Sequence, residues 1–170
     1  FGLHVSPDID TILYTLAGIE GSHGWGVRGD SFHCLDALRR LYTDTWFQLG
    51  DRDIATHLFR TEHLRRGLPL HRITRSLSDA HGLAASILPM SNDQVRTTVE
   101  TAEAGVLPFQ AYLVQQRGEG RVRAIRFRGI RNSRPAPGVL TAIRRATCII
   151  IPPSNPLVSI APILALRGVR

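Results

Sequence analysis

The sequence predicts an α/β protein with a Rossmann-like parallel sheet flanked by helices and a small β-rich insertion. Four consecutive β-forming residues, Cys148–Ile151, precede two prolines and are typical of a strand buried on both faces. A second apolar run, Thr45–Leu49, ends at a Gly-Asp-Arg-Asp turn and is followed by a helical pattern. Alternation within residues 95–128 favours half-exposed strands, which we assign to the insertion.

Residues 1–83 are predicted to be part of the Rossmann-like core, mostly as helices. Phe1–Val5 is interpreted as the end of a strand. Ser6–Thr11 then opens a helix, with a proline and two carboxylates in the first turn, where the helix dipole favours them. Further helices are predicted to begin near residues 30, 54 and 69.

Residues 84–130 are predicted to form the β-rich insertion. Three strands are expected there, namely Ala85–Pro89, Val95–Thr101 and Val122–Arg128. The segment Pro108–Val114 fits a helix and a strand equally well. Residues 131–170 return the chain to the core, through a helix that follows Pro135–Gly138 and the strand that starts at Cys148.

The charge of the chain points to small anions as partners. The net charge is +7, and all 21 basic residues are arginines. They are scattered, and the aromatic residues, 6% of the chain, do not interleave with them as base-stacking platforms would, so we expect no nucleic acid as a partner. Arginine suits bidentate contact with phosphate groups, which favours anionic metabolites.

Cysteine spacing argues against a zinc-binding or disulfide-stabilised protein, and hydropathy argues against a membrane or secreted protein. Cys34 and Cys148 lie far apart and follow no zinc or disulfide pattern, so both are expected to be buried or half-buried thiols of a reducing compartment. Neither an apolar run of membrane-spanning length nor a signal-peptide pattern occurs in the sequence. We therefore expect a cytoplasmic protein without a membrane partner.

Polar residues follow both of the predicted core strands. Ser154 and Asn155 come after Cys148–Ile151, and Asp51–Asp53 comes after Thr45–Leu49. Because ligands of parallel sheets bind at the carboxyl ends of the strands, these loops are candidates for contact with an anion. The alternatives are a turn with a helix cap at Ser154 and Asn155, and a helix cap with a surface ion pair at Asp51–Asp53.

Two carboxylates, Asp8 and Asp10, stand two residues apart at the start of the first predicted helix. At this spacing one side chain can face a ligand while the other caps the helix. Together they have the chemistry to hold a divalent cation that accompanies a diphosphate. The alternative is that both only complement the helix dipole.

Several motifs occur in one order along the chain: Gly2–Leu16, Gly24–Gly26, Gly29–Phe32, Leu49–His57, Leu88–Ser91, Arg117–Gly118, Ala136–Leu140 and Pro153–Pro156. Together they closely resemble the 2-phospho-L-lactate transferase family of deazaflavin coenzyme (coenzyme F-420) biosynthesis, through nearly the whole chain. Members of that family are longer, with a glycine-rich turn before the position of Phe1 and a further C-terminal portion. We therefore expect this chain to be an internal segment that is inactive alone.

The resemblance implies a transferase reaction. A 2-phospholactyl or enolpyruvyl phosphate group would pass from a guanosine diphosphate-linked donor to 7,8-didemethyl-8-hydroxy-5-deazariboflavin, with release of GMP. Such a displacement depends on positioning the acceptor hydroxyl and neutralising the diphosphate charge, usually with Mg²⁺. The sequence does not choose between the two donors, and it leaves the oligomeric state open, a homodimer included.

The resemblance also implies the site residues. Asp10 would bind the deazaflavin or its bridging Mg²⁺, and Arg52 would contact the deazaflavin or the transferred phosphate, which makes these two the candidate catalytic residues. Asp51 and Thr56 fall in the same motif and are expected to bind substrate. Ser154 and Asn155 would lie against the guanosine phosphates.

A protein of a different class shares the expected fold. Nucleotide-sugar-binding regulators bind their ligand without transferring a group. The resemblance implies a glycine-rich segment in place of Ser154–Pro156 in those regulators, and no second carboxylate in the counterpart of Asp8–Asp10. The present chain has the transferase version at both places.

Overall fold

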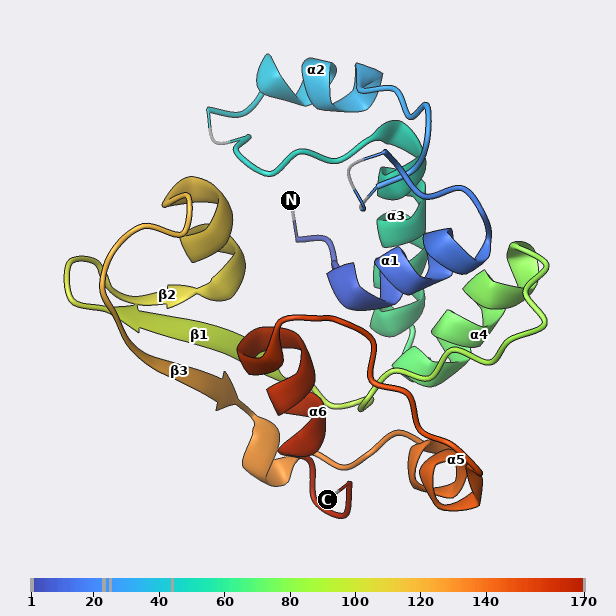
Figure 1. Ribbon diagram of the computed structural model, residues 1–170. Coiled ribbons are helices and arrows are strands. Elements are labelled where there is room, and N and C mark those ends of the chain that lie inside the picture. Colours follow the sequence, from blue (N-terminus) through green and yellow to red (C-terminus); the bar gives the residue numbers. More distant parts are fainter. Residues whose placement is uncertain (1, 23, 25, 44, 170) are drawn as a thin grey trace. The chain divides into compact units, whose positions relative to one another are not determined.

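The chain divides into two units, residues 1–89 and 90–170, and the described residues of the first unit contain four helices, which Figure 1 labels. The computed structural model describes residues 2–22, 24, 26–43 and 45–169. The helices of the first unit are α1 (Pro7–Leu16), α2 (His33–Arg39), α3 (Asp51–Arg65) and α4 (Leu70–Ala80). Among the described residues, no helix is long and apolar enough to cross a membrane.

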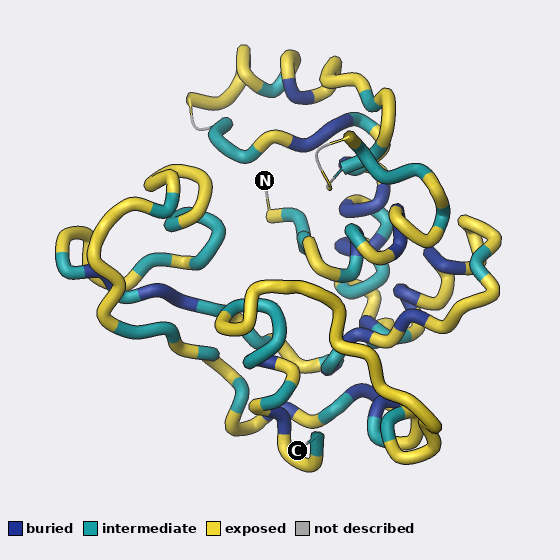
Figure 2. The backbone as a smooth tube through the Cα atoms, in the orientation of Figure 1, coloured by how far each residue is buried: buried dark blue, intermediate teal, exposed yellow. Residues whose placement is uncertain are grey.

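The core of the first unit lies between α1, α4 and the loops beside them. One face of α4 packs inward (Figure 2). The residues spaced along that face are buried, namely Leu70, Ile73, Thr74 and Leu77. The fully packed cluster consists of Leu13, Tyr14, Ile73, Leu77 and Ile87. Phe59 and Leu64 of α3 pack against this cluster and hold that helix beside it.

The second unit is built on a three-stranded antiparallel sheet in the order β2-β1-β3. Its strands are β1 (Arg96–Thr101), β2 (Gly105–Pro108) and β3 (Val122–Arg128). Val99 of the central strand is paired with Leu107 on one side and Ile125 on the other, which places three apolar side chains on one face. Short helical segments follow the strands: η1 (Ala111–Gln115), η2 (Ile130–Asn132), α5 (Val139–Arg145), η3 (Pro156–Ile160) and α6 (Ala161–Leu164).

The predicted α/β class is confirmed, with a small sheet and helices in one chain. The expected strands at Val95–Thr101 and Val122–Arg128 are present within one residue. The ambiguous segment Pro108–Val114 is the end of β2 followed by the helical turn η1. The parallel part of the predicted sheet is not among the elements of the described residues, where the one named sheet is antiparallel.

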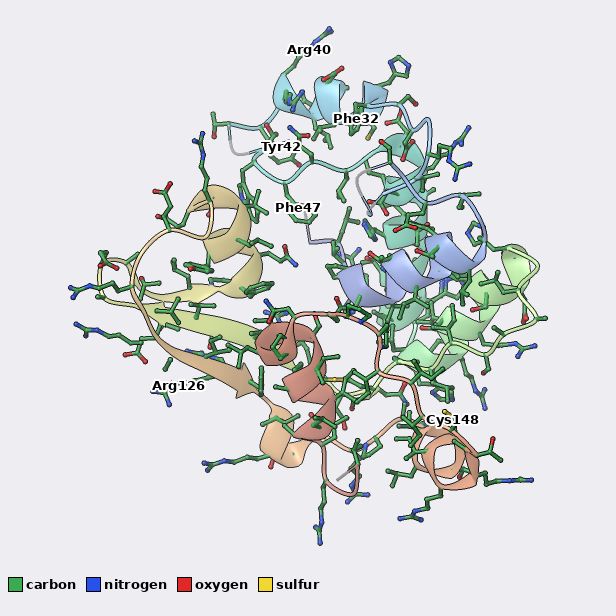
Figure 3. The ribbon with its side chains drawn as sticks, in the orientation of Figure 1. Phe32, Arg40, Tyr42, Phe47, Arg126 and Cys148 are labelled. Carbon is green, nitrogen blue, oxygen red and sulfur yellow. The ribbon has the colours of Figure 1, made fainter. Side chains whose placement is uncertain are left out.

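The strand predicted at Cys148–Ile151 is wrong. These residues form an extended loop, and Ile149, Ile150 and Ile151 are 62%, 82% and 62% exposed. Cys148, labelled in Figure 3 on the segment after α5, is exposed as well, as is Cys34, so the expected burial of the thiols is also wrong. A strand exists only where a neighbour accepts its backbone hydrogen bonds, and no described segment pairs with this one.

The strands predicted at Thr45–Leu49 and Ala85–Pro89 are wrong for the same reason. Both segments are irregular, although Leu49 and Ile87 are buried. Their apolar residues pack into the first unit from loops. A buried loop can therefore have the same apolar sequence pattern as a strand. The described part of Phe1–Val5 is irregular too, while Phe1 and Trp25 lie outside the described residues.

Candidate functional site

Asp10 and Arg60 form a buried ion pair inside the first unit. Arg60 Nη1 donates to Asp10 Oδ2 over 3.1 Å, and Nη2 donates to Oδ1. The residues are 4% and 0% exposed. Burial raises the pKa of Asp10 above its ordinary value, and the charge and hydrogen bonds of Arg60 oppose that rise without cancelling it. The pair therefore fixes α1 against α3 at an electrostatic cost.

His57 lies beside this pair on α3. Arg60 Nη1 donates to His57 Nδ1 over 3.1 Å, so Nδ1 is an acceptor and the ring proton belongs on Nε2. His57 Nε2 lies 3.3 Å from Asp53 Oδ1, without the angle of a full hydrogen bond. The imidazole therefore links the ion pair to a second carboxylate one turn earlier in the helix.

That second carboxylate, Asp53, also faces Tyr14 of α1. Tyr14 Oη donates to Asp53 Oδ1 over 2.8 Å and lies 2.9 Å from Thr56 Oγ1. Burial disfavours ionised Asp53, but the facing His57 and Tyr14 outweigh burial and lower its pKa. Burial raises the pKa of Tyr14, so its hydroxyl stays a donor. We call the whole set the buried polar cluster: Asp10, Tyr14, Asp53, Thr56, His57 and Arg60.

The buried polar cluster brings together two of the predicted site residues, Asp10 and Thr56. Its other members were not singled out as site residues from the sequence. A signal was present: residues 53, 57 and 60 recur at four and three positions along α3, and residues 10 and 14 stand one turn apart on α1. A polar stripe at that spacing on two helices predicts a shared polar face.

Two aspartates cap two helices reciprocally at the start of α3. Asp30 Oδ1 accepts from the backbone N–H of Arg52 over 2.9 Å, and its Oδ2 accepts from that of Asp53 over 3.2 Å. Asp51, the first residue of α3, accepts in turn from the backbone N–H groups of His33 and Cys34 at the start of α2. Both carboxylates satisfy helix N-terminal donors, but Asp51 caps the preceding helix α2 and not the helix that it begins, so the cap expected from Asp51–Asp53 for α3 comes from Asp30 instead.

Gly50→Ala should lower the free energy of unfolding by about 1–3 kcal/mol. Gly50 has φ −74° and ψ 164°, which alanine adopts freely, so backbone strain is not the cause. A Cβ atom at this position would overlap the Asp30 carboxylate, which would have to leave the start of α3. Chemical denaturation measures the loss. In an Asp30→Gly background, which removes the Cβ atom as well as the carboxylate, the same change should cost less than about 0.5 kcal/mol, and an undiminished cost there would refute the overlap.

The acid titration of Asp51 is a second testable property of this capping. Hydrogen bonds from the Cys34 amide, the Ser31 hydroxyl and the His33 amide lower the pKa of Asp51 below its ordinary 3.8. Its stabilising contribution is therefore complete above pH 3.8 and is lost as the pH falls through the lower, folded-state pKa. A carboxyl ¹³C titration by NMR should give a value below 3.8. A value at or above 3.8 would mean that the cap does not form.

Arg52 is exposed on the first turn of α3, next to the cap. Its Nη1 donates to the carbonyl of Arg28 over 3.5 Å. Within the described part of the chain, this is the one hydrogen bond of its guanidinium, which carries five N–H donors. Arg52 is thus the predicted site residue with the most unused capacity for an anion.

Ser154 and Asn155 belong to the second unit, and both are exposed. The carboxamide oxygen of Asn155 accepts from the backbone N–H groups of Leu157 and Val158, over 3.0 and 3.2 Å, and so caps η3. The cap alternative is therefore correct for that oxygen. The two N–H donors of the same carboxamide and the Ser154 hydroxyl remain the groups that suit an anion.

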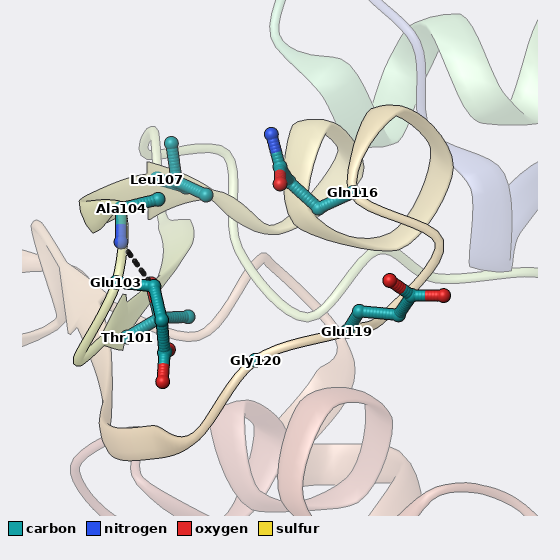
Figure 4. A pocket seen from close by; sticks show the side chains of 7 residues that line it. All are labelled: Thr101, Glu103, Ala104, Leu107, Gln116, Glu119 and Gly120. Atoms are coloured by element: carbon teal, nitrogen blue, oxygen red, sulfur yellow. Dashed lines mark hydrogen bonds between the residues drawn. The ribbon is translucent and has the colours of Figure 1, made fainter.

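A small open pocket also occurs in the second unit, with a volume of about 210 Å³ (Figure 4). It is lined by Thr101, Glu103, Ala104, Leu107, Gln116, Glu119 and Gly120. None of the predicted site residues lines it, and it is smaller than the roughly 300 Å³ at which ligand pockets begin. We therefore assign no substrate to this pocket.

The described residues do not fit a magnesium site at Asp10. Both oxygens of that carboxylate receive N–H donors from Arg60, whereas Mg²⁺ needs free oxygen ligands. Within the described ranges, no group of three or more His, Cys, Asp or Glu side chains is placed to hold a metal. Magnesium therefore stays a prediction from the resemblance, and no step of the reaction is assigned to it.

Comparison with known families gives a match over residues 1–170 to the model of 2-phospho-L-lactate transferase CofD. The chain belongs to this family. Curated relatives include a 2-phospho-L-lactate transferase of Methanospirillum hungatei, which is 42% identical over 99% of this chain and 57% of its own length. A phosphoenolpyruvate transferase of Streptomyces griseus is 45% identical over 100% of this chain and 55% of its own length. This CofD-family chain thus spans little more than half the length of these relatives.

Solved structures agree on the fold of the CofD-family chain. A crystal structure of a UPF0052 family member from Bacillus halodurans superposes with a TM-score of 0.58, over 93% of this chain and 46% of that one. The two sequences are 16% identical, so the likeness concerns the fold alone. It does not separate a transferase from a regulator that shares the architecture.

Proposed function

We propose that the protein is a transferase that moves a 2-phospholactyl or enolpyruvyl phosphate group from a guanosine diphosphate-linked donor to 7,8-didemethyl-8-hydroxy-5-deazariboflavin. GMP is the second product, and the reaction is a step in coenzyme F-420 biosynthesis. The family match along the whole chain is the observation that supports this most. Relatives named for the two donors are 42% and 45% identical to the chain, so the proposal keeps both donors.

The proposed reaction is a displacement at phosphorus. The terminal ribityl hydroxyl oxygen of the deazaflavin forms a bond to the phosphorus next to the lactyl or enolpyruvyl group. The bond from that phosphorus to the bridging oxygen of the diphosphate breaks, GMP leaves with the electron pair, and the hydroxyl proton passes to water. Such a reaction depends on placing donor and acceptor in line and on positive groups around the phosphates.

Arg52 is the residue to which we assign the transferred phosphate or the deazaflavin. It is exposed, carries a permanent charge and has donors to spare on the first turn of α3. Asp51 and Thr56, on the same helix, are proposed to bind substrate, and Asp10 to contact the deazaflavin from α1. Of these, Asp10 and Thr56 are buried in the present arrangement, so their contact with substrate requires that it reach the buried polar cluster.

Ser154 and Asn155 are proposed to bind the guanosine phosphates from the second unit. The Ser154 hydroxyl and the carboxamide N–H groups of Asn155 supply neutral donors to phosphate oxygens. The cap formed by the Asn155 oxygen fixes the direction in which these N–H groups point.

A product assay tests the proposal. The protein is incubated with the guanosine diphosphate-linked donor and Mg²⁺, with and without the deazaflavin, and GMP is separated and quantified by chromatography. We expect GMP release only when the deazaflavin is present. Binding of the donor without any release of GMP would instead identify a non-catalytic regulator of the same fold.

Arg52→Ala should weaken deazaflavin binding by about 10- to 100-fold, because a charged hydrogen bond to the ligand is lost. A titration that follows deazaflavin fluorescence measures the dissociation constant. Arg66→Ala is the matched control, since Arg66 directly follows the same helix, is exposed and pairs with Glu62. Unchanged affinity in Arg52→Ala would remove Arg52 from the site.

A further inference from the structure

The segment Arg28–Ser31 holds the start of α3 through several independent contacts. The Asp30 carboxylate accepts from the backbone N–H groups of Arg52 and Asp53, and from that of Ser31 over 2.9 Å. The carbonyl of Ser31 accepts from the N–H of Asp51 over 2.8 Å. The first three residues of α3 are therefore each tied by their backbone to this segment.

The same segment also holds the far end of the Arg52 side chain. The carbonyl of Arg28 accepts from Arg52 Nη1. Asp30, two residues later in the sequence, accepts from the backbone N–H of the same arginine. Gly29 lies between them with φ 63°, in the left-handed region that glycine adopts without strain. This turn lets the Arg28 carbonyl and the Asp30 carboxylate both face Arg52.

The position of the Asp30 carboxylate depends on the glycine beside it. The space next to Gly50 is open only because that residue lacks a Cβ, and the carboxylate occupies it. A shorter side chain at position 30 would leave the N–H groups of Arg52 and Asp53 without this acceptor.

We propose that Asp30 is a positioning residue for Arg52: its carboxylate fixes the first turn of α3, and through the Arg28–Asp30 turn it sets the direction of the Arg52 guanidinium. The inference rests on the proposed function in assigning a substrate anion to Arg52. Asp30 itself is assigned no contact with the substrate, because its oxygens already accept from the backbone N–H groups of Ser31, Arg52 and Asp53.

A double-mutant cycle on deazaflavin affinity tests this coupling. Asp30→Asn keeps the shape of the side chain but turns its N–H donors toward the backbone N–H of Asp53. We expect deazaflavin binding, measured by fluorescence titration, to weaken about tenfold. In an Arg52→Ala background the same change should alter affinity less than about twofold. Equal factors in both backgrounds would overturn the proposal, because Asp30 would then act on the protein as a whole. Asp79→Asn, an exposed carboxylate paired with Arg75 on α4, is the control.

Amide hydrogen exchange decides the structural half of the proposal without any ligand. In Asp30→Asn the amides of Arg52 and Asp53 should exchange at least about tenfold faster, while amides near Leu64 at the other end of α3 keep their rates. Unchanged exchange at Arg52 and Asp53 would overturn the proposal. If the wild-type protein bound no deazaflavin, the proposed function would fail, and the exchange rates would still test whether Asp30 holds Arg52.

Discussion

Arg60→Leu is expected to lower the free energy of unfolding by about 3–5 kcal/mol, because it removes one partner of a buried ion pair. Asp10 would be left buried without its cation, and the carbonyl of His4 would lose the donor it has in Arg60 Nη1. Urea denaturation at neutral pH measures the loss. Arg66→Leu, at the residue directly after the same helix, is the control, and since Arg66 is exposed it should cost no more than about 0.5 kcal/mol.

The penalty of Arg60→Leu should depend on pH. Without Arg60, the buried Asp10 has a still higher pKa, so the folded protein takes up a proton more readily than the unfolded chain. The penalty is therefore complete above the folded-state pKa of Asp10 in the variant and shrinks as the pH falls from there toward the lower, but still raised, folded-state pKa of Asp10 in the wild-type protein. A penalty that shrinks nowhere between about pH 8 and pH 3.8 would show that Asp10 is not the group left uncompensated.

Asp10→Asn should reduce turnover by about 100-fold or more, because it removes the charge proposed to face the deazaflavin and leaves Arg60 partly unpaired. Arg60 cannot relieve this by losing its proton, so some stability is lost as well, about 1–3 kcal/mol. Steady-state GMP release, measured well below the unfolding temperature, gives the turnover.

Asp8→Asn is the matched control for Asp10→Asn. Asp8 lies in the same first turn of α1, exposed and two residues away. Its loss should cost no more than about 1 kcal/mol of stability, the value of a charge at a helix start, and should leave turnover near wild type. Equal losses of turnover at the two positions would contradict the separation of roles between them.

Helices were predictable from this sequence because their signals are local. Proline and carboxylates at the start of α1, and apolar residues at one-face spacing in α4, fix those elements within a few residues of the chain. The strands β1 and β3 were predictable for the same reason, since one face of each is polar. The short strand β2 carries too few residues to show alternation.

Strands were overpredicted where an apolar run has no neighbour to pair with. Two of the wrongly predicted strands have β-forming composition, namely Thr45–Leu49 and Cys148–Ile151. Strand pairing needs a second segment, so the sequence of one segment alone does not determine it. Composition sets a preference for extended backbone, and both segments are extended or irregular loops. Whether such a preference becomes a strand depends on a partner.

The candidate site was predictable only in part. A family resemblance and the positions next to predicted strands pointed to Asp10, Arg52, Ser154 and Asn155. The contacts that join Asp10 to Arg60, and Asp30 to Arg52, span 50 and 22 positions of sequence. Long-range pairs of this kind have no local signature, so the structure had to supply them.

The reciprocal caps of α2 and α3 also bear on how the first unit folds. Asp30 completes the first turn of α3, and Asp51 completes that of α2, so each helix lacks acceptors for its N-terminal donors until the loop between them has closed. Nucleation of a short helix is unfavourable when its first turn lacks partners. The two helices should therefore open and close as one cooperative unit, and amides in both should report a single opening free energy in native-state hydrogen exchange.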